Sequence, residues 1–320
     1  MSRVLVTGAA GFVGRILCRA LAERGYVVRA AVRRPCSVSG AAEIVEAADL
    51  GAQRDWRELL EGVDCVIHAA GRAHVRPIRE ANWREYFRTN TLATENLAWA
   101  AADGGARRFV YVSSVKVNGE ETKGSAFRAT DEPAAQDIYG ISKWLGEQAV
   151  LRVAGRTRMQ AIVIRSPLVY GPGVRGNFLR LMRLIDRGIP LPLANISNAR
   201  SLVNVWNLCD LLTHVLETGP GLGRIWMVSD GEDLSTPELI RRLARAMRRR
   251  PRLLAVPPGA LRGCARVMGR EAEYTRLCGS LVVDASETRR GLEWQPPVSV
   301  DEGIERTVAW YAEGAARHDR

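Results

Sequence analysis

Short apolar runs alternate with helix-like segments along the first half of the chain. The runs have the length and composition of buried strands, and they lie at 4–6, 27–32, 65–70, 109–112 and 161–164. Between them apolar residues recur at helical spacing, first at 13–21 and then near 56–60, 86–101 and 139–150. Strands that alternate with helices form parallel sheets covered on both faces. The pattern predicts an α/β fold with a doubly wound parallel sheet of the Rossmann type.

Three glycines follow the first predicted strand, at positions 8, 11 and 14. Glycine lacks a Cβ, so the backbone can turn sharply and approach a ligand, while the helix that opens near Gly11 presents free N–H groups and its positive dipole end. The spacing differs from G-x-G-x-x-G, so the flanking strand and helix carry the interpretation. We predict a dinucleotide phosphate site at Gly8, Gly11, Phe12, Val13 and Gly14.

A second lobe is expected from Gly171 onward, where glycine and proline become frequent and the alternation weakens. We assign 1–170 to a dinucleotide-binding domain and 171–320 to a smaller C-terminal α/β substrate lobe interleaved with it. Strand-like runs at 201–205 and 226–229 are expected to return to the large sheet. Helical patterns at 237–250 and 301–313 complete the second half.

The chain is strongly basic, with a formal net charge of +11. An anionic partner such as nucleic acid, a nucleotide sugar or an acidic membrane surface would fit this charge. However, Lys116, Lys123 and Lys143 are the only lysines, and so many arginines in an alanine-rich chain indicate a compositional bias. The run Arg248–Arg250 follows a helical pattern, where cations favour the helix dipole. No nucleic-acid partner is expected.

Cysteine and histidine are scattered. The six cysteines form no C-x-x-C pair and the four histidines form no cluster, so we expect neither disulfides nor a metal site. The chain shows no charged start before an apolar run and no run of about 18 apolar residues. We therefore expect a cytoplasmic protein that is not inserted in a membrane.

Tyr139 and Lys143 stand four residues apart, on one face of a predicted helix. A nearby ammonium stabilises a phenolate, which would tune the tyrosine for proton exchange. Ser113 and Ser114 directly follow the strand at 109–112, at the carboxyl end where open α/β sheets place their ligands. Both serines could instead serve turn backbone groups. We predict that Ser114, Tyr139 and Lys143 are catalytic.

The glycines, the serine and the Y-x-x-x-K pattern together resemble the extended short-chain dehydrogenase/reductases, which include nucleotide-sugar epimerases, dehydratases and ketoreductases. The resemblance spans nearly the whole chain. Its further motifs lie at Asp49-Leu50, 68–71, 90–97, 165–172, 284–286, 292–294 and 310–311. It implies a homodimer, and it implies cofactor contacts at Asp49, Leu50, Ala69, Ala70, Gly71, Tyr139 and Lys143.

Within this superfamily, four patterns look most similar to bacterial UDP-4-keto-6-deoxy-N-acetylhexosamine 4-reductases, which serve surface polysaccharide synthesis. They lie at 113–120, 176–178, 191–193 and 228–237. By resemblance, Ser114 orients the 4-oxygen, Tyr139 is the general acid and Lys143 holds the nicotinamide ribose. Substrate contacts are expected at Ser114, Lys116, Asn177, Arg200 and Arg276.

Two departures bear on the type of reaction. UDP-glucose 4-epimerases usually carry a tyrosine where this chain has Asn118, and the acid expected after the second strand is replaced by Arg33 and Arg34. Arginine attracts a 2′-phosphate. We therefore expect Arg33 to contact the cofactor and NADP(H) to be preferred, with NAD(H) as the alternative. A UDP-hexose 4-epimerase that retains NAD and a non-catalytic dinucleotide-sensing protein are the other interpretations.

Overall fold

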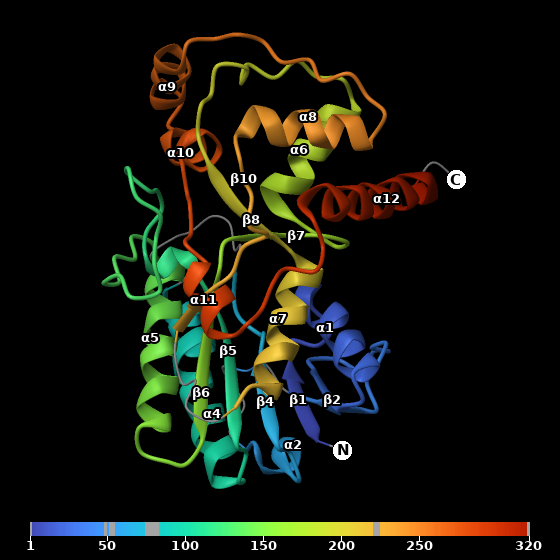
Figure 1. Ribbon diagram of the computed structural model, residues 1–320, viewed down its shortest axis with the longest axis vertical. Coiled ribbons are helices and arrows are strands. Elements are labelled where there is room, and N and C mark those ends of the chain that lie inside the picture. The colour runs from blue at the N-terminus through green and yellow to red at the C-terminus, as the bar shows by residue number, and fades with distance from the viewer. Residues whose placement is uncertain (1, 48–49, 51–54, 74–82, 220–224, 319–320) are drawn as a thin grey trace.

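A seven-stranded parallel sheet forms the centre of the larger lobe (Figure 1). The computed structural model describes residues 2–47, 50, 55–73, 83–219 and 225–318. The strand order is β3-β2-β1-β4-β5-β6-β9. The strands are β1 (Arg3–Thr7), β2 (Val27–Val32), β3 (Glu43–Glu46), β4 (Cys65–His68), β5 (Arg108–Ser114), β6 (Gln160–Ser166) and β9 (Ile225–Met227). The order turns back at β1, and the predicted doubly wound fold is confirmed.

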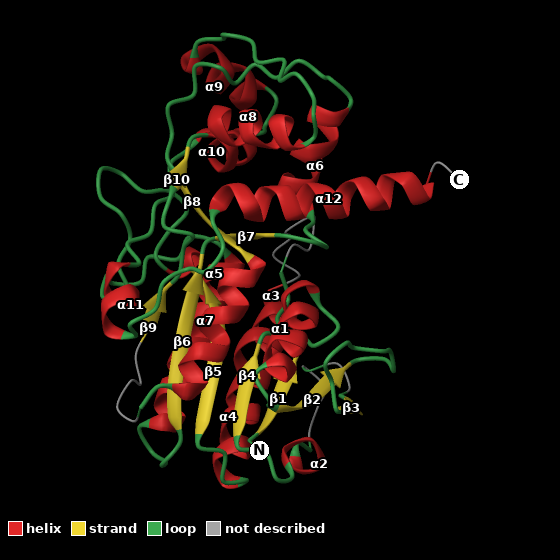
Figure 2. Ribbon diagram, turned by 45° about the vertical axis from the view of Figure 1, so that its right-hand side comes forward, coloured by secondary structure: helices red, strands yellow, loops and turns green. Residues whose placement is uncertain are grey.

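Helices cover both faces of this sheet (Figure 2). One face carries α1 (Phe12–Glu23) and α7 (Val205–Glu217). The other face carries α2 (Arg57–Leu60), α4 (Ala93–Asp103) and α5 (Ile138–Ala154). Before α4, the chain forms α3 (Trp83–Phe87) and a π-helical segment, η2 (Arg88–Leu92). None of the helices in the described ranges is long and apolar enough to cross a bilayer.

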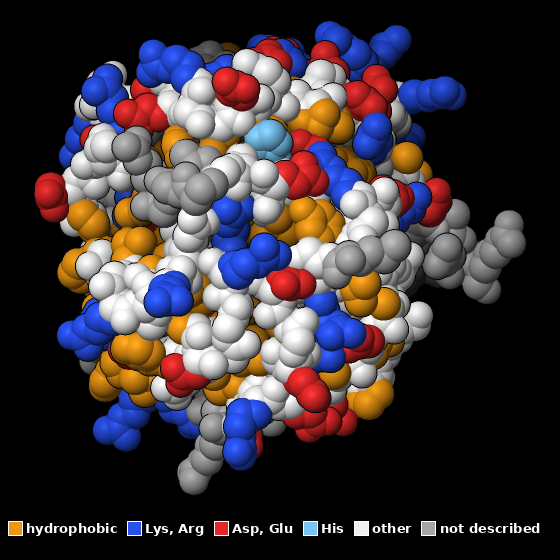
Figure 3. Space-filling view, turned by 60° about the horizontal axis from the view of Figure 1, so that its bottom comes forward, with side chains coloured by type: hydrophobic (Ala, Val, Ile, Leu, Met, Phe, Trp, Pro, Cys, Tyr) orange, Lys and Arg blue, Asp and Glu red, His pale blue; other side chains and the backbone are white. Residues whose placement is uncertain are grey.

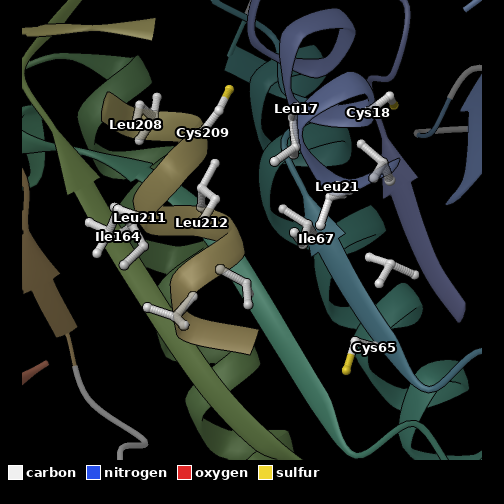
Figure 4. Close-up of a cluster of buried hydrophobic side chains, with 14 of the residues drawn as sticks. Leu17, Cys18, Leu21, Cys65, Ile67, Ile164, Leu208, Cys209, Leu211 and Leu212 are labelled. Atoms are coloured by element: carbon white, nitrogen blue, oxygen red, sulfur yellow. The ribbon is translucent and has the colours of Figure 1, made fainter. Parts of the chain in front are cut away.

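The buried side chains between α1, α7 and the sheet form one continuous apolar cluster (Figure 4). Leu17 and Leu21 of α1 and Leu211 of α7 are fully buried there against Ile67 and Ile164 of the strands. Burying one such side chain stabilises a fold by about 1.5 to 3 kcal/mol. Helix α7 therefore belongs to the core of the larger lobe, although it follows residue 171 in the sequence.

A second, three-stranded sheet lies between the two lobes, in the order β10-β8-β7. Its strands are β7 (Leu168–Tyr170), β8 (Arg200–Asn204) and β10 (Asp233–Leu234). The expectation that the strand at 201–205 returns to the large sheet is wrong, because β8 pairs with β7 and β10 instead. The strand at 226–229 does return: β9 pairs with β6.

The smaller lobe is mainly helical. Its helices are α6 (Gly176–Asp186), α8 (Thr236–Ala246), α9 (Pro258–Val267), α10 (Glu271–Cys278) and α12 (Val300–His318). A separate core cluster joins α6, α8 and α12 with the small sheet through Met182, Leu202, Ile240 and Ile304. Two short elements complete the chain, η3 (Val115–Val117) after β5 and α11 (Ser286–Gly291) beside β9.

The chain leaves helix α8 through a residue with an unusual backbone conformation. Arg248, two residues after its last helical residue, has a φ of +54°. Side chains other than glycine are strained in this left-handed conformation, and glycine is the common choice there. Arg248→Gly should raise the free energy of unfolding by about 0.5 to 1 kcal/mol. Urea denaturation measures this, with the exposed Arg245→Gly inside α8 as a control that should destabilise.

Candidate active site

The glycine turn after β1 is shaped for a close backbone approach. Gly8 has a φ of +71°, and a Cβ there would lie 2.9 Å from the Cα of Ala70 at the end of β4. A Cβ on Gly14 would lie 2.1 Å from the carbonyl oxygen of Gly8. No side chain caps α1 at Gly11. Since the first N–H groups of a helix have no intrahelical partner, this end of α1 can receive a phosphate.

Other predicted cofactor residues lie along the same edge of the sheet. Ala69, Ala70 and Gly71 directly follow β4, and Arg33 is exposed directly after β2. Phe12 and Val13 form the first turn of α1. The Leu50 side chain is buried in the apolar cluster on the α4 and α5 face, which leaves its backbone for any cofactor contact. Asp49 lies outside the described residues.

The three predicted catalytic residues meet at the carboxyl end of β5. Ser114 is the last residue of β5, and a hydrogen bond joins its side chain to Tyr139 of α5. The Ser114 Oγ also accepts a hydrogen bond of 3.3 Å from the backbone N–H of Lys116, so the serine serves a turn as well. Lys143 follows one turn after Tyr139 on α5 and is 3% exposed.

Burial shifts the pKa of both ionisable groups in this triad. It raises the pKa of Tyr139 to about 12, and the hydrogen bond with Ser114 opposes the rise. It lowers the pKa of Lys143 to about 7, and the negative charge of Glu147 opposes that fall. Near pH 7 the phenol therefore holds its proton and can donate it, while the ammonium of Lys143 titrates in the same range.

The Lys143 side chain is enclosed by the Tyr111 ring and by the segment that follows β4. Its Nζ is 3.9 Å from the centroid of the Tyr111 ring, within the range of a cation–π contact. Helix α5 approaches η2 closely because residue 146 is glycine, where a Cβ would lie 2.5 Å from the carbonyl oxygen of Asn90. A Cβ on Gly71 would lie 3.8 Å from Nζ. The segment after β4 therefore passes directly over the lysine.

Asn90 of η2 fixes this segment, a role that the sequence did not assign to it. The Asn90 Oδ1 accepts a hydrogen bond of 2.7 Å from the backbone N–H of Arg72, and its Nδ2 donates to the carbonyl oxygen of Arg72 at 3.1 Å. The Nδ2 also donates to the Ser142 Oγ at 2.9 Å. Local π-helical turns are frequent at functional sites. Asn90 thereby links α5 to the segment after β4.

A buried ion pair is hydrogen-bonded to the end of β5. The Arg165 Nη2 of β6 lies 2.7 Å from the Glu147 Oε2 of α5, and these side chains are 1% and 0% exposed. Ser113 donates a hydrogen bond of 2.5 Å to Glu147, and Arg165 donates one of 3.1 Å to the Asn118 Oδ1. Asn118 thus has a structural partner. Sequence patterns missed this pair because a lone Glu on a helix usually lies at the surface.

His68 lies beneath the triad and is completely buried. Its ring nitrogens are hydrogen-bonded to Thr7 at 2.6 Å and to Thr94 at 3.0 Å, and the ring stacks on Tyr111. Burial first, and the charge of Lys143 second, lower the pKa of His68 to about 3. The ring is therefore neutral near pH 7 and acts as packing between the strands.

The predicted substrate residues occupy different situations. The Lys116 Nζ is engaged by Glu120 at 2.6 Å and by Asp137 at 2.5 Å, close to the triad. Arg200, at the start of β8, donates a hydrogen bond of 2.9 Å to the carbonyl oxygen of Gly279. Burial lowers the pKa of this guanidinium. Because arginine keeps its positive charge in proteins, Arg200 remains a cation with donors to spare.

The last two candidates lie on helices of the smaller lobe. Asn177 is exposed in the first turn of α6, and Arg276 is half-buried on α10. Arg276 makes no ion pair with the described residues. The structure brings Ser114, Tyr139, Lys143 and the glycine turn to one edge of the large sheet, while Arg200 and Arg276 both lie near the end of α10.

Comparison with known proteins agrees with this arrangement. A family model described as the NAD dependent epimerase/dehydratase family matches residues 4–228. A UDP-glucose 4-epimerase of Vibrio cholerae is 39% identical over 309 residues, which are 95% of this chain and 94% of the relative. A ceramide reductase of Caulobacter vibrioides (strain NA1000 / CB15N) is 34% identical over 81% of this chain and 75% of its own length.

Among solved structures, MoeE5 in complex with UDP-glucose and NAD has a TM-score of 0.79 to this chain at 25% identity. The match covers 98% of this chain and 100% of MoeE5. The sequence match, the doubly wound sheet, the glycine turn and the serine, tyrosine and lysine at the end of β5 agree with one another. The chain belongs to the NAD-dependent epimerase/dehydratase family.

Proposed function

We propose that the protein reduces the C4 ketone of a UDP-4-keto-6-deoxy-N-acetylhexosamine with NADP(H), as a step in surface polysaccharide synthesis. The observation that carries the proposal is the meeting of Ser114, Tyr139 and Lys143 at the carboxyl end of β5. The Ser114 hydroxyl would donate a hydrogen bond to the ketone oxygen. Tyr139, protonated near pH 7, would transfer its proton to that oxygen as negative charge develops there.

The residues around the glycine turn fit a dinucleotide. Gly8 and Gly14 let the turn pack tightly, because a Cβ at either position would collide with the backbone of Ala70 or of Gly8, and the uncapped first turn of α1 can receive the pyrophosphate. When bound, the nicotinamide supplies the hydride. Lys143 would hold the ribose of the nicotinamide, since its side chain is fixed beneath the segment after β4. Arg200 would hold the UDP diphosphate, with Asn177 and Arg276 as weaker candidates and Lys116 near the sugar.

The choice of NADP(H) rests on the end of β2. Arg33 and Arg34 are exposed directly after Val32, where an enzyme selective for NAD carries an acid that accepts hydrogen bonds from the ribose hydroxyls. The exposed Glu46 at the end of β3 pairs in register with Val32, so a carboxylate is also present at this edge of the sheet. The two guanidinium groups attract a 2′-phosphate more strongly than the single carboxylate of Glu46 repels it.

The test is an assay at 340 nm with the purified protein and a UDP-4-keto-6-deoxy-N-acetylhexosamine. We expect stoichiometric oxidation of NADPH and slower oxidation of NADH. Arg33→Asp should abolish the preference for NADPH, because the carboxylate repels a 2′-phosphate. Arg19→Asp, the same charge change on the exposed side of α1, should keep it. An equal NADPH preference in the Arg33 variant would remove Arg33 from the cofactor site.

A second candidate is a UDP-hexose 4-epimerase that keeps NAD bound, and the relative from Vibrio cholerae favours it. An epimerase oxidises and re-reduces the same sugar, so it consumes no reduced cofactor. Purification with tightly held NAD, together with interconversion of UDP-glucose and UDP-galactose without NADPH oxidation, would establish the epimerase and refute the reductase. Binding of the dinucleotide without turnover of either sugar would indicate a sensing protein.

We extend the proposal to a homodimer formed through the helical face of η2, α4 and α5. Leu92 of η2 and Ile141 of α5 are each 42% exposed on this side of the larger lobe. Two copies that pack these helices together would cover both side chains. Sedimentation equilibrium tests this, and a monomer at micromolar concentration would contradict it.

A further inference from the structure

The part of the smaller lobe between α8 and α10 has an unusual composition. Residues 248–270 contain seven arginines and no acidic residue, lysine or aromatic residue. The arginines are interspersed with apolar residues rather than grouped. They stand at 248, 249, 250, 252, 262, 266 and 270, and all seven are exposed. A chain-wide arginine bias does not explain why acidic residues are missing from this one exposed segment.

Few of these arginines are neutralised within the protein. Arg249 pairs with Asp186, Arg262 with Glu271 and Arg270 with Glu273. The other arginines of the segment, including Arg250, Arg252 and Arg266, form no ion pair with any residue in the described ranges. The segment therefore presents uncompensated positive charge. By contrast, positive and negative side chains alternate on the face at the bottom of Figure 1 (Figure 3).

Large apolar side chains are exposed between these charges. Val267 is 90% exposed, Met268 63% and Leu254 51%, whereas most large apolar side chains in the described ranges are buried. Leu254 is held in place, because its backbone N–H donates a hydrogen bond of 2.8 Å to the carbonyl oxygen of Leu191. Leu261 packs partly against the core of the smaller lobe. The exposed apolar side chains thus sit on an anchored backbone.

The segment lies at the outer end of the smaller lobe. Helix α9 and the loop before it form the end of the molecule farthest from the amino ends of the large-sheet strands (Figure 1). Helix α9 contacts α10, and Gly279 directly after α10 accepts the hydrogen bond from Arg200. A partner bound to this segment would therefore meet the same lobe that carries the candidate diphosphate contact.

The side chains of residues 248–270 indicate which kind of partner this segment would bind. Exposed arginines beside exposed aliphatic side chains are typical of surfaces that lie in the interface of an anionic bilayer. A single-stranded nucleic acid would be bound with aromatic stacking residues, and none lies in 248–270. Duplex phosphates would engage the arginines but give Val267 and Met268 nothing apolar to contact. We propose that residues 248–270 form a peripheral binding surface for membranes rich in anionic phospholipid.

The proposal does not depend on the sugar that the enzyme uses, and it is tested without substrate. The full chain is sedimented with vesicles of phosphatidylcholine, either pure or mixed with phosphatidylglycerol. We expect binding to the mixed vesicles only, weakened by salt. Arg250→Gln, Arg252→Gln and Arg266→Gln combined should weaken binding about 100-fold, since each arginine near an anionic surface contributes about fivefold.

The matched control removes the same charge elsewhere. Arg107→Gln, Arg156→Gln and Arg158→Gln change exposed arginines at the opposite end of the molecule and should leave vesicle binding unchanged. Val267→Ser with Met268→Ser should weaken it about tenfold through lost apolar burial. All positions are exposed, so the variants should fold, and circular dichroism checks this.

Three outcomes would overturn the proposal. The first is equal binding to pure phosphatidylcholine and mixed vesicles, or binding to neither. The second is an equal loss in the control variant, which would mean that only net charge matters. The third is binding to a DNA duplex as tight as to mixed vesicles with no effect of the Val267 and Met268 changes, which would identify a general polyanion surface.

Discussion

Replacing Tyr139 with Phe should lower kcat by about 100- to 10,000-fold, the range of a lost general acid. The ring stays, so its edge-on contact with the Tyr86 ring, with the two centroids 6.4 Å apart, is kept and the fold should not change. The change removes the phenolic hydroxyl, and with it the proton held near pH 7 and the hydrogen bond with Ser114. Steady-state kinetics measure the loss, and fluorescence titration with NADPH should give a Kd close to that of the unmodified protein.

A tyrosine outside the site provides the control. Tyr311 of α12 donates a hydrogen bond of 3.2 Å to Asp186 in the smaller lobe, so Tyr311→Phe removes a phenolic hydroxyl far from the triad. Its kcat should stay within about twofold of the unmodified value. Near-normal turnover of the Tyr139 variant would show that another group supplies the proton.

Glu147→Ala should lower the free energy of unfolding by about 3 to 5 kcal/mol, since it leaves the buried charge of Arg165 without its partner. The pair is almost completely buried, so water cannot replace the lost carboxylate. Ser113 also loses the acceptor of its hydrogen bond. The midpoint of urea denaturation, followed by circular dichroism, measures the change.

Two further variants separate burial from charge. Glu95 lies on α4 and forms an exposed ion pair with Arg152 of α5, the helix that also carries Glu147. Glu95→Ala breaks this pair and should change stability by less than about 1 kcal/mol. Glu147→Leu combined with Arg165→Met replaces the whole pair by apolar groups and should recover most of the lost stability. Equal effects of the Glu147→Ala and Glu95→Ala variants would contradict this account.

The sequence was sufficient to predict the parts of the fold that local patterns encode. The strands β1, β4, β5 and β6 are centred on continuous apolar runs, and β2 is apolar except for Arg29. Both the glycine turn and the four-residue spacing of Tyr139 and Lys143 are local. Their meeting at one sheet edge follows from the parallel order, since carboxyl ends of parallel strands share an edge. The proximity of Ser114, Tyr139 and Lys143 could therefore be predicted without a structure, while their catalytic role stays a prediction.

What the sequence did not predict depends on distant partners. Strand β7 spans only Leu168–Tyr170 and β3 only Glu43–Glu46, too few residues to show a period. The placement of β8 beside β7 is a choice between two sheets that the strand's own residues do not encode. The π-helical turn at Asn90 and the burial of Glu147 likewise depend on residues that pack against them from other elements.

The return of α7 to the larger lobe limits how this protein can acquire a new substrate. Leu208, Leu211 and Leu212 complete the apolar face shared with α1, yet they follow β8 of the small sheet in the chain. A contiguous cut near residue 170 would strip that face from the larger lobe. Recombination at a single crossover therefore cannot exchange one smaller lobe for another, and new specificity has to arise through point substitutions and loop changes within an undivided chain.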